Sequence, residues 1–455
     1  MANSYLSRTP SSAGNRKTFT ISMWVKRSSL GVLQKPFSAG AVSGAFTAVE
    51  FPADDKPRLV GFDGSQITFD VTADLNARDV NGWYHMVWSV DTTQATANNR
   101  VKFYLNGTQI TDLATNTQPS QNADLDFNNN VGHNIGRGIY NGAEYFGGYI
   151  SHIAMVDGQA LAPTVFGETD STSGIWNFKS PSGVTWGTNG FHLKMENSGA
   201  LGTDSSGNSN TFTVNGNLKQ ALDTPSNVHA TFNVLSNYHA NETFSYGNNK
   251  IVSPGDRHDF AISTLGMNVN SGKYYAEFKL VAAAGSDHCV VGISDHSYMG
   301  SNEELSQENY SIAYVNGGAL RSSGTNAATG VGTYTAGDII GVAVDMDNLK
   351  IYWHKNGTYV NSGVPTSGST GTGAVSIHNI DTSPNSNSRG QGIYFFAAGN
   401  WHSGASSTWE ANFGNGYFGT TAITSAGSNG NGSLFEYDVP SGYYALNTKN
   451  INTYG

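Results

Sequence analysis

Apolar and polar residues alternate in short stretches along this chain, most clearly between residues 338 and 360. Every second residue there carries a larger apolar side chain: Ile340, Val342 and Val344. A period of two is typical of a strand with one buried face. The next stretch, 349–354, alternates in the same way, and Asn356-Gly357 then supplies the residue pair that best fits a type I′ hairpin turn. We therefore predict paired antiparallel strands here.

The same alternation recurs near the N-terminus, at 18–25 and 83–90, and a second Asn-Gly pair divides the stretch 100–110. Residues that favour turns, mainly Gly, Asn, Ser and Thr, separate these stretches. No long segment shows a period of 3.6, and the only helical feature we expect is one turn at 161–167. The pattern predicts an all-β protein.

Composition narrows the class of protein. A chain of 455 residues with 11% aromatic residues can bury the cores of two or three domains. Its formal net charge of −10 argues against nucleic acid as a partner, because phosphate contacts need clustered Lys and Arg. No apolar run approaches ~18 residues, so we expect no membrane insertion. Cys289 is the only cysteine and reads as part of a buried strand.

Two ordered sets of motifs resemble known binding families. One set is similar to a laminin G-like, concanavalin A-like domain and comprises residues 83–90, 101–107 and 148–161. The other resembles a SPRY (B30.2) domain and comprises residues 271–281, 290–295, 337–357 and 412–414. These resemblances imply two antiparallel β-sandwiches joined by a β-rich connector.

We accordingly divide the chain into four parts. They are a laminin G-like sandwich (1–168), a β-rich connector (169–240), a SPRY-like sandwich (241–424), and a linker with a C-terminal tail (425–455). The Gly/Ser/Asn composition of 425–433 favours flexibility. The tyrosine-rich tail beyond it could then reach a neighbouring subunit.

Catalytic patterns are missing from the sequence. Glycoside hydrolases with concanavalin A-like folds commonly carry carboxylates on alternate residues of one strand, and no such pattern occurs here. The glutamates at 303–308 lie in a polar stretch that reads as a solvated loop. His354 faces away from Trp353 in the predicted hairpin, which favours a solvent-facing or hydrogen-bonded role. We expect no catalytic residues and no enzyme.

Calcium is the usual metal of laminin G-like domains, bound through Asp and backbone oxygens. The candidates are Asp54-Asp55 and the loop 204–210, although the same residue types also form ordinary Asx-turns. We therefore assign no metal ligands and no cofactor, with calcium as the alternative.

Two aromatic loops are candidate ligand sites. The first, 399–407, contains Asn400, Trp401 and His402, and the second, 138–146, contains Tyr140 and Tyr145. Aromatic rings beside Asn, His and Gly suit stacking on a sugar ring or a peptide face. The alternative is that these side chains only cover the ends of the sandwiches.

The opening peptide 5–16 and the loop 204–210 are similar to virion proteins of marine bacteriophages. This resemblance implies a non-enzymatic protein of tail-fibre or capsid-fibre type at the virion surface, made in a host cytoplasm because no secretion signal is evident. Its partners would be other virion proteins and host surface glycans, and we expect a homo-oligomer, with a trimer favoured. The alternatives are a decoration subunit without a ligand and a polysaccharide-cleaving enzyme.

Overall fold

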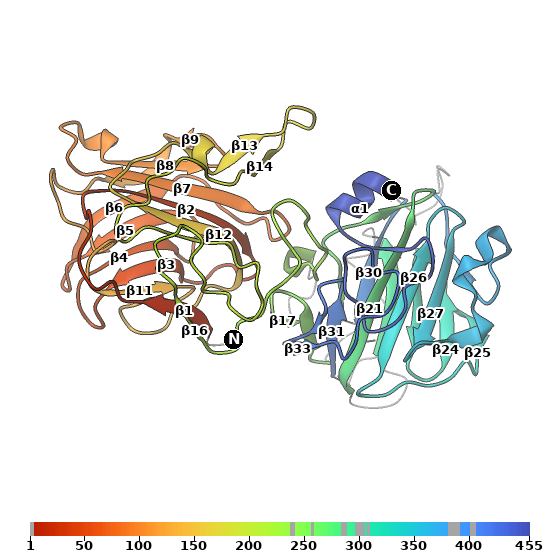
Figure 1. The fold of residues 1–455 in the computed structure, drawn as a ribbon. Coiled ribbons are helices and arrows are strands. Elements are labelled where there is room, and N and C mark those ends of the chain that lie inside the picture. The colour runs from red at the N-terminus through yellow and green to blue at the C-terminus, as the bar shows by residue number, and fades with distance from the viewer. Residues whose placement is uncertain are drawn as a thin grey trace. The chain divides into compact units, whose positions relative to one another are not determined.

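The computed structural model describes residues 4–236, 242–255, 259–283, 289–295, 305–306, 310–380, 392–400 and 406–455. The chain forms two compact units, Met1–Gln220 and Ala221–Gly455, and each is described by itself (Figure 1). Strands dominate both units, so the all-β prediction is confirmed. Within the described residues, no helix is long and apolar enough to cross a membrane.

The first unit is built from two antiparallel sheets. The eight-stranded sheet runs in the order β10 (Leu113–Thr117), β6 (Ile67–Ala73), β5 (Arg58–Phe62), β4 (Phe46–Phe51), β3 (Gln34–Gly40), β11 (Gly132–Ile135), β1 (Tyr5–Arg8) and β16 (Thr213–Asn215). The six-stranded sheet runs in the order β15 (Phe191–Leu193), β12 (Gly148–Asp157), β2 (Thr18–Arg27), β7 (Tyr84–Asp91), β8 (Val101–Leu105) and β9 (Thr108–Ile110). A small hairpin pairs β13 (Gly167–Thr169) with β14 (Trp176–Phe178), and two 3₁₀ turns are η1 (Ala97–Asn99) and η2 (Pro163–Val165).

The core of this unit collects the inward-facing side chains of both sheets. Trp88 of β7 stacks on Phe103 of β8 with ring centroids 4.1 Å apart, and Phe37 of β3 packs beside Phe127 at 4.6 Å. Alternate residues of each strand therefore point into one shared apolar layer, as the period of two predicts. The 3₁₀ turn η2 lies where one helical turn was expected.

The second unit also contains two sheets. Its nine-stranded sheet runs in the order β17 (Thr243–Ser245), β18 (Lys250–Ser253), β31 (Ser407–Asn412), β21 (Lys273–Ala283), β26 (Ile339–Asp345), β27 (Lys350–Lys355) and β28 (Thr358–Tyr359), with β29 (Val375–Ser376) on β27 and β34 (Tyr444–Ala445) on β21. Its seven-stranded sheet runs in the order β19 (Phe260–Ile262), β30 (Ile393–Asn400), β22 (Cys289–Asp295), β23 (Ser311–Val315), β24 (Ala319–Ser322) and β25 (Thr325–Thr329), with β20 (Met267–Asn268) on β30. Shorter elements are η3 (Val234–Ser236), η5 (Val360–Ser362), η6 (Pro365–Thr370), the hairpin of β32 (Tyr417–Phe418) and β33 (Thr421–Ala422), and α1 (Thr448–Tyr454).

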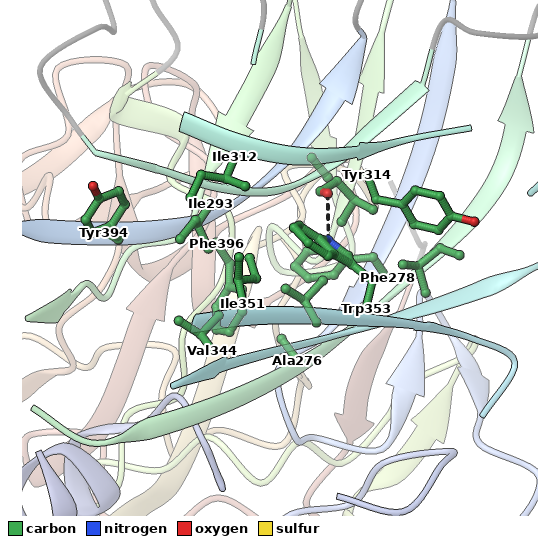
Figure 2. Packing of buried hydrophobic residues seen from close by; sticks show 14 of the residues in the cluster. Ala276, Phe278, Ile293, Ile312, Tyr314, Val344, Ile351, Trp353, Tyr394 and Phe396 are labelled. Carbon is green, nitrogen blue, oxygen red and sulfur yellow. Dashed lines mark hydrogen bonds between the residues drawn. The ribbon is translucent and has the colours of Figure 1, made fainter. Parts of the chain in front are cut away.

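Trp353 joins the two sheets of the second unit. Its ring lies in the core between them, among side chains from both layers (Figure 2). Its Nε1–H donates to the carbonyl oxygen of Val291 on β22, 3.1 Å away. Because an indole has only this one donor, the bond leaves no unmet polar group on the Trp353 side chain.

The predicted hairpin is confirmed. Asn356 and Gly357 have φ angles of 48° and 85°, and the corresponding pair in the first unit, Asn106 and Gly107, has 47° and 82°. These are the two positive values that a type I′ turn needs. Cys289 is buried in β22, as its sequence setting predicted.

The segment 169–240, predicted as a β-rich connector, is divided between the two units at Gln220. β15 extends the six-stranded sheet beside β12, and β16 extends the eight-stranded sheet beside β1. Without β15 and β16, the strands β12 and β1 would be edge strands with unpaired backbone groups. Each added strand forms hydrogen bonds with those groups. From Ala221 onward the chain belongs to the second unit, where Phe232 is fully buried.

The segment 425–455 also differs from the prediction. Instead of a flexible linker with a free tail, it folds onto the second unit, with hydrogen bonds from Gly427 N–H to the Phe435 carbonyl (2.9 Å) and from Val439 N–H to the Ser428 carbonyl (3.1 Å). Phe435, Val439 and Tyr443 are buried with side chains from β21, β26 and β27. The tail therefore covers part of the outer face of the nine-stranded sheet, over β21, β26 and β27, and β26 is buried on both faces instead of one.

Candidate binding surface

Residues 399, 400, 406 and 407 of the first candidate loop, 399–407, belong to the described part of the chain. Trp401 and His402 lie outside the described residues. Asn400 ends β30 and is fully buried, with its backbone N–H on the Asp259 carbonyl (2.7 Å) and its side-chain amide on the Ser253 carbonyl (3.5 Å). Its side chain therefore lies inside the second unit and not at a surface.

The second candidate loop, 138–146, is closed by its own hydrogen bonds. The N–H of Gly138 donates to the Ala143 carbonyl (2.8 Å), and the N–H of Ala143 donates to Oδ1 of Asn141 (3.0 Å). The Asn141 amide in turn donates to Glu144 Oε1 (3.1 Å). A loop held at this many points presents its side chains in a fixed arrangement, which lowers the entropy lost on binding.

Tyr140 completes a group of three half-buried rings at one end of the eight-stranded sheet. Phe46 of β4 and Phe62 of β5 lie side by side with centroids 5.4 Å apart, and the Tyr140 ring lies 5.8 Å from the first and 5.6 Å from the second. We call Phe46, Phe62 and Tyr140 the aromatic triangle. Its members are each partly exposed.

Tyr145 lies on the other side of the same loop. Its ring meets the ring of Tyr5 edge-on at 6.4 Å, and the guanidinium of Arg137 lies over the Tyr5 ring at 3.6 Å. The two tyrosines that the sequence singled out thus belong to one loop but contact different partners. The strands β1 and β11 are neighbours in the sheet (Figure 1). Leu6 pairs with Ile135, so Tyr5 lies close to the residues that lead into the loop.

A chain of ion pairs connects this loop to the outward face of the sheet. Arg58 binds Asp70 through two hydrogen bonds (3.0 and 2.6 Å) and Glu50 through a third (2.9 Å). Lys35 Nζ lies 3.5 Å from Glu50 and 2.8 Å from Glu144. Burial raises the pKa of Glu50, and the two cations beside it oppose that effect. The loop is thereby tied to β3, β4, β5 and β6.

Sequence reasoning missed Tyr5, Phe46, Phe62 and Arg137. A signal for two of them was present: Phe46 and Phe62 each occupy the strand face that also carries a charged residue, Glu50 in β4 and Arg58 in β5. A large ring on the polar face of an amphipathic strand indicates either a loop packed over it or a binding surface. Tyr5 and Arg137 gave no such pattern.

A Ser–His pair on the six-stranded sheet resembles a nucleophile with its base, but its protonation is wrong for that role. His85 Nδ1 accepts a hydrogen bond from the indole N–H of Trp176 (2.9 Å), and Nε2 lies 2.9 Å from Ser22 Oγ. Because indole can only donate, the neutral ring carries its proton on Nε2 and has no free base toward Ser22. Burial lowers the pKa of His85 to about 3.

The carboxylates suggested for calcium are engaged by protein groups. Asp55 is bound by Arg27 and Arg78, each at 2.8 Å. Asp204 accepts backbone hydrogen bonds from His192, Ser206 and Asn210. No group of three or more potential metal ligands occurs among the residues that the structure describes.

The sequence left two roles open for His354, solvent-facing or hydrogen-bonded. His354 is buried, and its Nε2 lies 2.6 Å from the Tyr275 hydroxyl, so it is hydrogen-bonded.

Comparisons with known proteins agree with this fold. Residues 2–165 match the family model described as the concanavalin A-like lectin/glucanases superfamily, and residues 273–375 match that of the SPRY domain. A search of curated proteins gave no match.

Two solved structures, one human and one bacterial, are similar to parts of this chain. The SPRY domain of human HERC1 is 15% identical, with a TM-score of 0.30, and the match covers 40% of this chain and 96% of that one. Domain 4 of AbnA, an arabinanase from Geobacillus stearothermophilus solved with arabinotriose, is 18% identical, with a TM-score of 0.26, over 33% of this chain and 65% of that one. At these TM-scores the likenesses bear on neither ligand nor activity. The chain combines a laminin G-type, concanavalin A-like domain with a SPRY domain.

Proposed function

We propose that this protein is a non-enzymatic surface component of a bacteriophage virion, of tail-fibre or capsid-fibre type, and that it binds host cell-surface glycans during attachment. A lectin-type domain in the first unit supports binding as the general function. The resemblance of residues 5–16 and 204–210 to phage virion proteins supports the setting. The proposal needs no metal or cofactor.

The aromatic triangle is the observation that carries the glycan proposal. Sugar rings have apolar C–H faces that stack on aromatic side chains, while polar groups at the rim of a site fix their orientation. Phe46, Phe62 and Tyr140 supply three rings within 6 Å of one another, and Asn141 and Glu144 supply polar groups in the same loop. The ion pairs of Lys35 hold this arrangement before any ligand arrives.

The test is binding of the full chain to an array of bacterial surface polysaccharides. The Tyr140→Ala variant should bind its best saccharide at least tenfold more weakly, because a stacked ring contributes on the order of 1.4 kcal/mol. Tyr246→Ala is the matched control: Tyr246 is 40% exposed and belongs to the second unit. Equal binding by both variants would exclude the aromatic triangle as the site.

Weak single sites would gain strength through several copies on one particle. We therefore keep a homo-oligomer, with a trimer favoured, as part of the proposal. Phe435, Val439 and Tyr443 are buried within the second unit, so an interface between subunits would use other residues. A decoration subunit without a ligand is the alternative, and an array with no bound saccharide would favour it.

A further inference from the structure

Arg137, directly before the loop 138–146, differs from the cations Lys35 and Arg58. It is half-buried, its guanidinium carbon lies 3.6 Å from the centre of the Tyr5 ring, and a Cβ placed on Gly142 would lie 3.8 Å from its Nη1, in van der Waals contact. The guanidinium is therefore held between the ring of Tyr5 and the tip of the loop that carries Tyr140 and Tyr145. Its position is fixed by stacking and packing rather than by a carboxylate.

The donors of Arg137 have no acceptor among the described residues. Its Nε is buried without a hydrogen-bond partner, and no hydrogen bond or ion pair involves the rest of its guanidinium in that part of the chain. A buried donor that is left unpaired destabilises the folded state. Such a group is unusual in a folded protein unless something else completes it.

The neighbouring cations are not available to a ligand. Lys35 is shared between Glu50 and Glu144, and Arg58 is shared between Asp70 and Glu50. Of these three cations, Arg137 is the one without a carboxylate partner among the described residues. A planar guanidinium matches a planar carboxylate or another oxyanion through paired N–H···O bonds.

We infer that the ligand bound at the loop 138–146 is an acidic saccharide, whose carboxylate binds Arg137 beside Tyr5 while another sugar unit of the same saccharide stacks on the aromatic triangle. The inference rests on the proposed glycan binding and names the class of glycan. Aromatic stacking would act on any pyranose ring, whereas the guanidinium would select those that carry a uronic-acid or similar carboxyl group.

The test uses the full chain and bacterial polysaccharides printed in pairs, each acidic polymer beside its carboxyl-reduced, neutral form. The acidic form should bind roughly tenfold more tightly, as expected for one charge-assisted pair. Raising NaCl from about 50 to about 500 mM should weaken the acidic form only, because salt screens the pair and not the stacking. This comparison needs no variant and so does not depend on one folding.

Arg137→Gln should bring both forms to the affinity of the neutral one, and Arg137→Lys should keep part of the difference because it keeps the charge without the planar donors. Arg321→Gln, in the second unit, is the control. Equal binding of acidic and reduced forms by the wild type would overturn this inference and leave the proposed function standing. Binding of no saccharide would overturn both.

Discussion

The carboxylate of Glu277 accepts a hydrogen bond from the backbone N–H of Tyr437, 160 positions later in the chain, at 2.8 Å. It accepts another from the N–H of Glu436 at 2.8 Å and a third from the Tyr275 hydroxyl at 3.0 Å. Glu277 is fully buried in β21. One carboxylate thus anchors the tail on the outer face of the nine-stranded sheet.

Removing that anchor should destabilise the second unit. Glu277→Ala leaves two part-buried backbone donors without an acceptor, and we expect a loss of about 3 kcal/mol in the free energy of unfolding. Urea unfolding of the full chain, followed by tryptophan fluorescence, measures it. Glu168→Ala is the control, since the Glu168 side chain is 61% exposed and should cost under about 0.5 kcal/mol. Equal effects of the two changes would contradict the anchoring role.

The same carboxylate should give the second unit an unusual pH dependence. Burial raises the pKa of Glu277 from 4.5 to about 7, against the opposing effect of its hydrogen bonds. The folded state then holds this proton more tightly than the unfolded state, so unfolding becomes easier as pH rises from about 4.5 to about 7. Glu277→Gln cannot titrate. The wild type should lose roughly 3 kcal/mol relative to this variant across that window, and a constant difference would disprove the shift.

The first unit should respond to acid in the opposite sense. Burial lowers the pKa of His85 to about 3 and those of His133, His152 and His192 to about 4, from 6.5. Each is neutral when folded and gains a proton more readily when unfolded. Stability is complete above about pH 6.5 and falls as the pH drops toward 4. Thermal unfolding at several pH values in that range measures it.

His152→Asn should flatten that acid dependence. Asn removes the titrating ring and tolerates the φ of 46° at this position. His378→Asn, at an exposed site of the second unit, should leave the profile of the first unit unchanged. A profile that stays the same in both variants would show that His152 does not contribute.

Gly357 combines a turn conformation with close packing. Its φ is 85°, and a Cβ there would lie 2.8 Å from the Tyr437 ring. Gly357→Val should therefore destabilise the second unit by more than Gly337→Val, where φ is 99° but nothing lies within 4 Å. The second change should cost about 1–2 kcal/mol and the first roughly 1–3 more. Adding Tyr437→Ala to Gly357→Val should recover the extra part. If it recovers nothing, the contact with Tyr437 does not contribute.

Local sequence patterns predicted most of the fold. The alternation at Ile340, Val342 and Val344 placed these side chains correctly in the core, and the Asn-Gly pairs placed both hairpin turns. Such features depend on neighbours in sequence, where the period of side chains and the φ preference of two residues decide the outcome.

These local patterns could not predict which strands pair when they lie far apart in the sequence. The strand β16 is only three residues long, and nothing in its sequence indicates that it adds to β1. The tail reads as flexible because Gly, Ser and Asn dominate residues 425–433. Its buried residues, Phe435, Val439 and Tyr443, recur every fourth residue, so the strand period of two does not reveal them. Of the candidate site, the loop with Tyr140 and Tyr145 was visible in the sequence, while Phe46, Phe62 and Arg137 joined it only through the fold.

The position of the tail has a consequence for how the protein is made. β21 and β26 emerge from the ribosome well before the segment that covers them, and until residues 435–446 follow, the buried carboxyl of Glu277 and the rings of Tyr275 and Tyr352 face water. The second unit can then reach its final state only after synthesis of this late segment, whereas the first unit has all its strands by residue 215. A chain cut short before residue 435 would display an apolar sheet face, marking itself for removal before it could join an assembly.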